Sequence, residues 1–387
     1  MIKVAIVGVG NCASSLYQGL TFYKDNNENG LMKQCIGGYN ITDIEVVAAF
    51  DVDSRKVGKH FKEAMVSFPN CTPMYCDYNN LPTGPLVKKG PVLDGIAQHM
   101  LEQSEEEGFR ISEVDVVDVV AELVASKADI LINYLPVGSQ RATEFYAQCC
   151  LDSKIGFMNC IPVFIASDPV WEQRFIDAGL PIVGDDMKSQ FGASILSQMI
   201  QELAFARGHK VKCHIQRNIG GNTDFLNMVD QKRLKSKKVS KENVIKSQNR
   251  IRGIDCSESF LHAGPSEYIR WYKDNKVANF RVEMEGFMGA PVILDAQLSV
   301  MDSPNSAGVV IDAIRYLKVA SELGLRGSLR GPSAFTQKSP PLQMTFEDAV
   351  AECDALSERT LTKFTKRQTE WYSAEEMMKT NPSNNTI

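Results

Sequence analysis

Short runs of apolar, mostly β-branched residues alternate with segments of helical hydrophobic spacing along the first half of the chain. Such runs are typical of strands that are buried on both faces of a parallel sheet. The runs predict strands over residues 4–7, 44–50, 130–134, 156–159 and 181–184. Helices are predicted over residues 114–126 and 142–151, and from Asp168, an N-cap residue followed by proline. This order predicts a parallel sheet with helices on both faces.

The pattern changes after Asp185. One long amphipathic helix is predicted over residues 193–207, and it is followed by segments that alternate apolar and polar residues. Alternation is typical of half-buried strands, so residues 210–215, 280–285 and 292–300 predict an α+β unit with a more antiparallel sheet. A second long helix, over residues 306–323, is expected to pack back on the first sheet. The polar residues 380–387 predict a frayed tail.

Composition restricts the class of protein. The 387 residues suggest two or three domains, and a net charge of −5 argues against a nucleic-acid or anionic-membrane binder. No apolar run approaches the length of a membrane span. The ten cysteines are scattered and no secretory signal is recognisable, so reduced thiols and a cytoplasmic location are expected. No CxxC pair exists and the five histidines lie apart, which does not favour a zinc site.

A glycine turn gives the first chemical signal. Gly8, Gly10 and Ala13 fit the pattern GxGxxA directly after the first predicted strand, with Asn11 and Cys12 between them. The first glycine permits a tight turn, the second lets the backbone approach a pyrophosphate, and the small third residue lets the helix pack closely. An ordinary strand-to-helix turn is the alternative, but the position after the opening strand favours a dinucleotide site.

An acidic residue strengthens the dinucleotide interpretation. Asp51 ends the second predicted strand, where a carboxylate can accept hydrogen bonds from the adenine ribose and thereby favour NAD over NADP. Asp53 is a rival for this role. The spacing from the glycine turn is longer than usual, which residues 23–30 explain as an inserted loop.

Polar segments in the second half of the chain each allow a functional and a purely structural interpretation. Residues 184–189 follow a strand, where open α/β sheets bind ligands, but simple helix capping explains Asp186 and Ser189 equally well. Residues 220–224 form another polar turn. Lys237 and Lys241 lie on one face if their segment is helical, and on their own they indicate only a solvated surface.

The order of several motifs makes a resemblance specific. The chain resembles the myo-inositol-1-phosphate synthase (inositol-3-phosphate synthase) family, particularly its short bacterial form, through VAIVGVGNCASS, AAFDVD, NYLPVGS, FYAQC, PVFIASDPVW, PIVGDDMKSQ, GGNTDFLNM, SKKVSK, MDSPNSAGVVIDA and KSPP. The match covers nearly the whole chain up to about Thr360. The resemblance implies a Rossmann-type α/β domain over residues 1–188 and 303–360, an inserted α+β catalytic and tetramerisation domain over 189–302, and a C-terminal extension over 361–387.

The resemblance also implies the chemistry. Members convert glucose 6-phosphate to 1D-myo-inositol 3-phosphate: NAD takes hydride from C5, the C6 proton is removed, the enolate attacks the C1 aldehyde, and the C5 ketone is reduced again. The implied catalytic residues are Lys237, Lys241, Lys276, Lys338, Asp186 and Asp302. The implied substrate-binding residues are Ser189, Asn222 and Asp224. Cofactor contacts fall to Gly8, Gly10, Asn11, Cys12, Ala13, Asp51, Asn133, Pro136 and Asn159. A homotetramer is implied by the family alone.

Three other functions remain open at the level of sequence. An ordinary NAD-dependent dehydrogenase of similar architecture would release NADH, and a regulatory NAD-binding protein would carry the lysines on its surface. A related synthase could act on another sugar phosphate. The residues do not determine whether a divalent or monovalent cation is needed.

Overall fold

The computed structural model describes residues 1–25, 29–230, 246 and 259–361. Its larger sheet has seven strands in the order β13-β8-β7-β6-β1-β4-β5, and every pairing is parallel. The strands are β1 (Ile2–Val7), β4 (Ile44–Asp51), β5 (Val87–Lys89), β6 (Ile130–Asn133), β7 (Gly156–Asn159), β8 (Pro181–Val183) and β13 (Gly327–Ser328). The chain reverses direction of winding at β1, between β4 and β6, which is where Rossmann-type sheets open a ligand crevice.

Helices cover both faces of this sheet, because successive residues of each strand point to opposite sides. On one face Val4 and Ile6 pack with helices α1 (Asn11–Phe22), α10 (Asp302–Glu322) and α12 (Phe346–Ser357). On the other face Ala5 and Val7 pack with α4 (Val119–Ser126), α5 (Gln140–Ser153) and α6 (Pro169–Ala178). The structure is therefore a mixed α/β fold with a Rossmann-type parallel sheet, as the sequence predicts.

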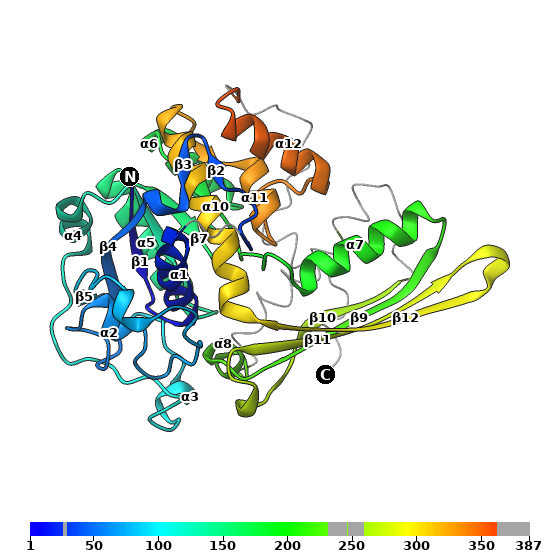
Figure 1. Cartoon of the computed structure of the whole chain (residues 1–387), viewed down its shortest axis with the longest axis horizontal. Helices are drawn as coiled ribbons and strands as arrows, with labels where there is room; N and C mark the ends of the chain where they lie inside the picture. The colour runs from blue at the N-terminus through cyan, green and yellow to red at the C-terminus, as the bar shows by residue number, and fades with distance from the viewer. Residues whose placement is uncertain (26–28, 231–245, 247–258, 362–387) are drawn as a thin grey trace.

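A second sheet extends away from the first, with α7 (Ala193–Ala206) lying along it (Figure 1). Its order is β10-β9-β11-β12, and it comprises β9 (Lys210–Gly220), β10 (Phe260–Tyr268), β11 (Asn275–Glu285) and β12 (Pro291–Met301). β11 pairs antiparallel with β9 and β12, whereas β10 pairs parallel with β9. α10 follows β12 directly and returns the chain to the core of the first sheet, where Val310 and Ile314 are buried. The assignment of domain boundaries stays a prediction.

The short elements complete the description. The helical ones are α2 (Phe61–Ala64), α3 (Gln98–Leu101), α8 (Thr223–Asn227) and α11 (Arg330–Thr336), with 3-10 turns at Tyr23–Asp25, Ile41–Asp43, Tyr78–Asn80, Arg270–Tyr272 and Phe287–Gly289. A small hairpin joins β2 (Cys35–Ile36) to β3 (Tyr39–Asn40). None of the helices in the described ranges has the length and apolar character needed to cross a membrane.

Several element boundaries differ from the prediction. The helix expected over residues 114–126 begins only at Val119, because the Asp118 carboxylate caps it by accepting a hydrogen bond from the Ala121 amide at 3.0 Å. The second long helix begins at Asp302, four residues before its predicted start. β9 and β11 are both longer than predicted. The tail over residues 380–387 and the extension from residue 362 lie outside the described residues.

Candidate active site

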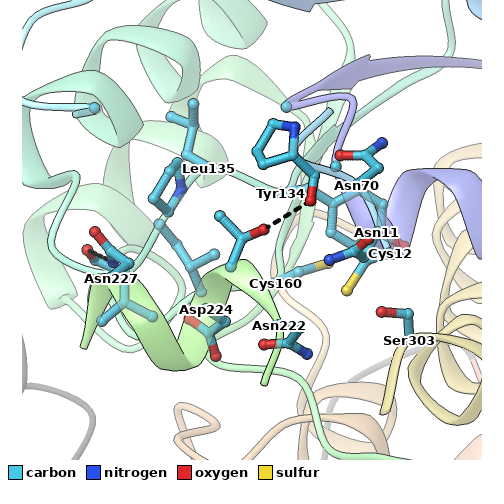
Figure 2. A pocket seen from close by; sticks show the side chains of 18 of the residues that line it. Asn11, Cys12, Asn70, Tyr134, Leu135, Cys160, Asn222, Asp224, Asn227 and Ser303 are labelled. Atoms are coloured by element: carbon cyan, nitrogen blue, oxygen red, sulfur yellow. Dashed lines mark hydrogen bonds between the residues drawn. The ribbon is translucent and has the colours of Figure 1, made fainter. Parts of the chain in front are cut away.

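One cavity lies at the carboxyl ends of β1, β4 and β6, and both sheets contribute to its wall (Figure 2). The first sheet supplies the glycine turn and Asp51. The second sheet and its neighbouring helices supply side chains that lie more than a hundred residues later in the sequence. Among the predicted site residues, the cavity is lined by Gly8, Gly10, Asn11, Cys12, Asp51, Pro136, Ser189, Asn222, Asp224, Lys276 and Asp302.

The glycine turn has the backbone shape that the sequence requires. Gly8 has a φ of +89°, and a Cβ atom there would lie 2.6 Å from the carbonyl oxygen of Tyr134. A side chain at Gly8 is therefore excluded both by conformation and by space. A Cβ at Gly10 would meet no atom within 4 Å, so this part of the backbone faces open space. Helix α1 begins at Asn11 and directs its first amide groups toward that space.

The peptide groups of Val9 are held from both sides. The Asp51 carboxylate accepts a hydrogen bond from the Val9 amide at 2.7 Å. The Val9 carbonyl accepts hydrogen bonds from the Lys56 ammonium at 2.8 Å and from the Asn70 side chain at 3.0 Å. Burial lowers the pKa of Lys56, and the nearby Asp51 and Asp53 carboxylates oppose that shift. Lys56 and Asn70 thus fix the turn, and no signal in the sequence indicated either residue.

The two rival acidic residues occupy different environments. Asp51 lines the cavity. Asp53 is fully buried, pairs with Arg55 and accepts a hydrogen bond from the Arg110 amide at 3.0 Å. Although burial opposes it, the bonds from Arg55 lower the pKa of Asp53. Asp53 therefore stabilises a loop, and Asp51 is the acid that a ligand in the cavity can reach.

Residues after the second glycine connect to a neighbouring loop. The Asn11 side-chain oxygen accepts hydrogen bonds from the amides of Cys71 and Thr72 at 2.7 and 3.1 Å. Burial raises the pKa of Cys12 to about 12, so its thiol is neutral at physiological pH. Ala13 is fully buried and packs in the core beneath the turn. This segment offers backbone donors to a ligand, with no reactive thiolate.

A pair of charged side chains lies in the part of the wall that β11 and α10 supply. Lys276, at the start of β11, forms an ion pair with Asp302, the first residue of α10. The backbone places them together, because the Asp302 amide donates to the carbonyl of Asp274 at 2.9 Å. Both side chains are largely shielded from solvent, which strengthens their interaction with any ligand charge.

Asp274 joins the elements around this pair. Its carboxylate accepts hydrogen bonds from Ser303 Oγ at 2.7 Å, Thr72 Oγ1 at 2.9 Å and Asn222 Nδ2 at 3.3 Å. Burial raises the pKa of Asp274 to about 6, although these hydrogen bonds favour the charged form. The predicted substrate residue Asn222 is also the N-cap of α8 and accepts a hydrogen bond from the Phe225 amide. Asp274 did not appear among the residues that the sequence indicated.

A second lysine–aspartate pair lies beside the cavity. Lys338 donates to the Asp186 carboxylate at 2.8 Å and to the carbonyl of Met187 at 2.7 Å, and Met187 lines the cavity although Lys338 itself does not. Asp186 is almost fully buried and has a φ of +61°, which is unfavourable for a residue with a side chain. Such strain is concentrated at functional sites, because the surrounding structure must hold it in place.

The remaining predicted residues either lie buried away from the cavity or fall outside the described part of the chain. Asn133 and Asn159 are fully buried at the ends of β6 and β7, do not line the cavity, and form a hydrogen bond to each other at 2.9 Å. Asn159 also donates to Asp185 at 2.7 Å, and burial raises the pKa of Asp185 to about 6. Lys237 and Lys241 lie outside the described residues. Within the described ranges no cluster of three His, Cys, Asp or Glu residues could hold a metal ion.

Comparisons with known proteins identify the family of the chain. The family profile described as myo-inositol-1-phosphate synthase matches residues 192–303. The chain is 45% identical to an inositol-3-phosphate synthase from Mycolicibacterium smegmatis over 363 residues, which is 92% of this chain and 98% of that protein. The chain belongs to the inositol-3-phosphate synthase family.

Solved structures show the same fold. The chain is similar to a protein called Ari2, with 32% identity, a TM-score of 0.73, and coverage of 93% of this chain and 99% of that one. A myo-inositol-1-phosphate synthase-related protein from Thermotoga maritima has a TM-score of 0.76 at 24% identity, covering 92% of this chain and 98% of that one. The fold of inositol-3-phosphate synthases therefore holds over nearly the whole chain.

Proposed function

We propose that this chain is an NAD-dependent isomerase that converts glucose 6-phosphate to 1D-myo-inositol 3-phosphate. One observation carries the proposal: a dinucleotide-type glycine turn with Asp51 and the ion pair of Lys276 with Asp302 line the same cavity. A substrate bound in this cavity would then contact both the redox cofactor and a charged group that can stabilise an enolate. Family membership, at 45% identity over most of the chain, supports the same activity.

The cavity fits a dinucleotide. The open backbone at Gly10 and the first amides of α1 suit a pyrophosphate, and the Asp51 carboxylate suits the adenine ribose hydroxyls. Pro136 lines the cavity, whereas buried Asn133 and Asn159 would position the strand ends beneath it. When bound, NAD supplies hydride transfer, and it is regenerated because the net reaction is an isomerisation.

The chain's own residues would manage charge and protons. The Lys276 ammonium, held by Asp302, can stabilise negative charge that develops on a carbonyl oxygen. Lys338, held by Asp186, supplies a second fixed positive charge beside the cavity. Ser189, Asn222 and Asp224 line the wall and can bind hydroxyl or phosphate oxygens. By family resemblance Lys237 and Lys241 complete the lysine set, with Lys241 and Lys276 as the candidates for proton transfer and carbonyl polarisation.

The direct test is incubation of the protein with glucose 6-phosphate and NAD, with the product identified by NMR. We expect an inositol monophosphate and no net growth of NADH absorbance during turnover. Stoichiometric NADH would instead indicate an ordinary dehydrogenase. A different cyclic product, formed only from another sugar phosphate, would indicate a related synthase.

We also propose a homotetramer that assembles through the second sheet. Large apolar side chains are exposed on α7 and on the turn and strand that follow β11, and contact with another copy of the chain would remove them from water. The residues are Leu203, Phe205, Phe287, Met288 and Ile293. The number of subunits follows from the family resemblance.

A further inference from the structure

A buried carboxamide in the cavity has an unused acceptor. Asn227 lines the cavity and is 1% exposed, and its Nδ2 donates to the carbonyl of Val137 at 3.0 Å. Its Oδ1 atom is buried and has no hydrogen-bond partner in the part of the chain that the structure describes. Because the Val137 carbonyl can only accept, this bond identifies which amide atom is nitrogen and leaves Oδ1 as the unpaired one. Burying an unpaired acceptor is costly, so a ligand donor is expected there.

The position of Asn227 identifies which part of a dinucleotide would reach it. Helix α8 begins beside Asp274, near the lysine–aspartate pair, and Asn227 is its last residue, about one and a half turns further on. Figure 2 shows Asn222, Asp224 and Asn227 in that order across the view, with Asn227 on the side opposite Ser303. Chemistry on the substrate places the nicotinamide near the lysines. The adenine would therefore lie toward Asn227.

The walls near Asn227 suit a flat, apolar base. Leu226 packs with Ile96 and Phe109 in one apolar cluster, and Phe225 packs with Val137 in another. Except for Leu226, these residues line the cavity, as do Gly95, which precedes Ile96, and Val52, which follows the ribose acid Asp51. Among buried side-chain atoms without partners in the described ranges, the only other one that lines the cavity is the Tyr134 hydroxyl. Tyr134 belongs to the glycine turn's surroundings, since its carbonyl oxygen would lie 2.6 Å from a Cβ atom at Gly8.

We propose that Asn227 is the residue that recognises adenine, by accepting a hydrogen bond from its exocyclic amine through Oδ1. The proposal rests on the proposed use of NAD. Adenine carries a donor at this position, whereas hypoxanthine carries a carbonyl oxygen, which would face Oδ1 acceptor to acceptor. A site built to pair with a donor rejects an analogue that lacks it. The chain should therefore discriminate between NAD and nicotinamide hypoxanthine dinucleotide.

The test is calorimetric measurement of the affinity of both dinucleotides for the full chain. Wild-type protein should bind NAD at least about tenfold more tightly than the hypoxanthine analogue, the scale of one unpaired buried group. Asn227→Leu should weaken NAD binding by a similar factor, leave the analogue's affinity nearly unchanged, and so abolish the preference. Thermal melting of each variant checks that it is folded.

Asn279→Leu is the matched control, because Asn279 lies on β11 outside the cavity and pairs only with the Gln297 side chain among described side chains. It should leave both affinities unchanged. Equal binding of the two dinucleotides by wild-type protein would overturn the assignment of Asn227 while leaving NAD use intact. If Asn227→Leu weakened the binding of NAD and of the analogue equally, the assignment would also be overturned. The Asn227 side chain would then only stabilise the cavity wall and would not recognise adenine. Binding of neither dinucleotide by wild-type protein would overturn the proposed function itself.

Discussion

Three of the charged side chains at the cavity are each held by a specific partner. Lys276 is paired with Asp302, Lys338 is bound to Asp186, and the Asp51 carboxylate accepts a hydrogen bond from the glycine turn. Groups held in this way need little reorganisation when charge develops in a transition state, which is how preorganised sites lower a barrier. The sequence could indicate these residues, but only the tertiary structure shows how they are paired.

Asp51 should determine the choice between dinucleotides. Its carboxylate would repel the 2′-phosphate of NADP, so wild-type protein is expected to prefer NAD. Asp51→Ala should weaken NAD binding and relax this preference, as measured by titration with each dinucleotide. Asp51→Asn separates two effects, because it removes the charge but keeps an acceptor for the Val9 amide. Tighter binding of NADP than NAD by wild-type protein would be incompatible with the role of Asp51.

Lys276 should be essential for turnover but not for cofactor binding. Lys276→Ala is expected to lower turnover by at least about 100-fold, the scale of losing an oxyanion donor or a positioned base, while NAD still binds. The same loss is expected for Lys241→Ala. Lys212→Ala is the control. Lys212, near the start of β9, forms an ion pair at 3.3 Å with Glu285, the last residue of β11, whereas Lys276 lies near the first residue of β11. Turnover of the control should be unchanged.

The lysines should act as charged donors without forming an imine. Oxidation at C5 already acidifies the C6 proton, so a Schiff base is not required. Borohydride added during turnover should therefore leave no sugar attached to the protein. Mass spectrometry that detects a reduced sugar adduct on Lys241 or Lys276 would refute this mechanism, although the overall reaction would stand.

At the scale of elements, a buried polar layer joins α7 to β9. Gln201 donates to Nδ1 of His214 at 2.9 Å, and Nε2 of His214 lies 3.0 Å from the Ser197 hydroxyl. The Ser197 hydroxyl donates its proton to Gln216 at 2.8 Å, so it accepts from His214. This arrangement requires the neutral imidazole with its proton on Nε2. A second proton, on Nδ1, would face the Gln201 amide donor.

This layer should make the packing of α7 sensitive to acid. Burial lowers the pKa of His214 to about 4, below the unfolded value of about 6.5. The unfolded chain therefore takes up the proton first, and stability present above pH 6.5 is lost as the pH falls toward 4. The loss between pH 7 and pH 5 is about 2 kcal/mol. Urea unfolding at both pH values should show a smaller loss for His214→Gln than for wild-type protein, and an identical loss would contradict the prediction.

Element boundaries were predictable only where local pattern decides them. The strands of the parallel sheet are apolar runs, and those that the pattern identified lie where it placed them. β10 was missed because its sequence, FLHAGPSEY, contains glycine and proline and has no regular alternation; the strand exists through its pairing with β9. β5 was missed because it is only three residues long. Such elements depend on neighbours that are distant in sequence.

At the scale of the whole molecule, the cavity depends on contacts between the two sheets. Asp274, which precedes β11, accepts a hydrogen bond from Thr72 of the first sheet's loops, 202 residues away. Lys56 and Asn70 reach the glycine turn from 47 and 61 residues away. Periodicity and motif spacing report only local order, so they located the glycine turn and the Rossmann-type sheet but could not indicate these three residues. Family resemblance supplied the lysines that pattern alone assigned to a solvated surface.

The exposed apolar side chains of the second sheet should be covered in the assembled protein. Light scattering on wild-type protein is expected to give the mass of four chains. Leu203, on α7, and Ile293, on β12, are 64% and 53% exposed, so replacing both by glutamate should do little to the single chain. If these positions lie in an interface, the glutamates would bury uncompensated charge there and weaken the association of subunits. The mass measured by light scattering should therefore fall. Val170→Glu on α6 is the control, because Val170 is 70% exposed and lies on the first sheet's helices. A four-chain mass retained by the double variant would show that this face of the second sheet is not where subunits meet.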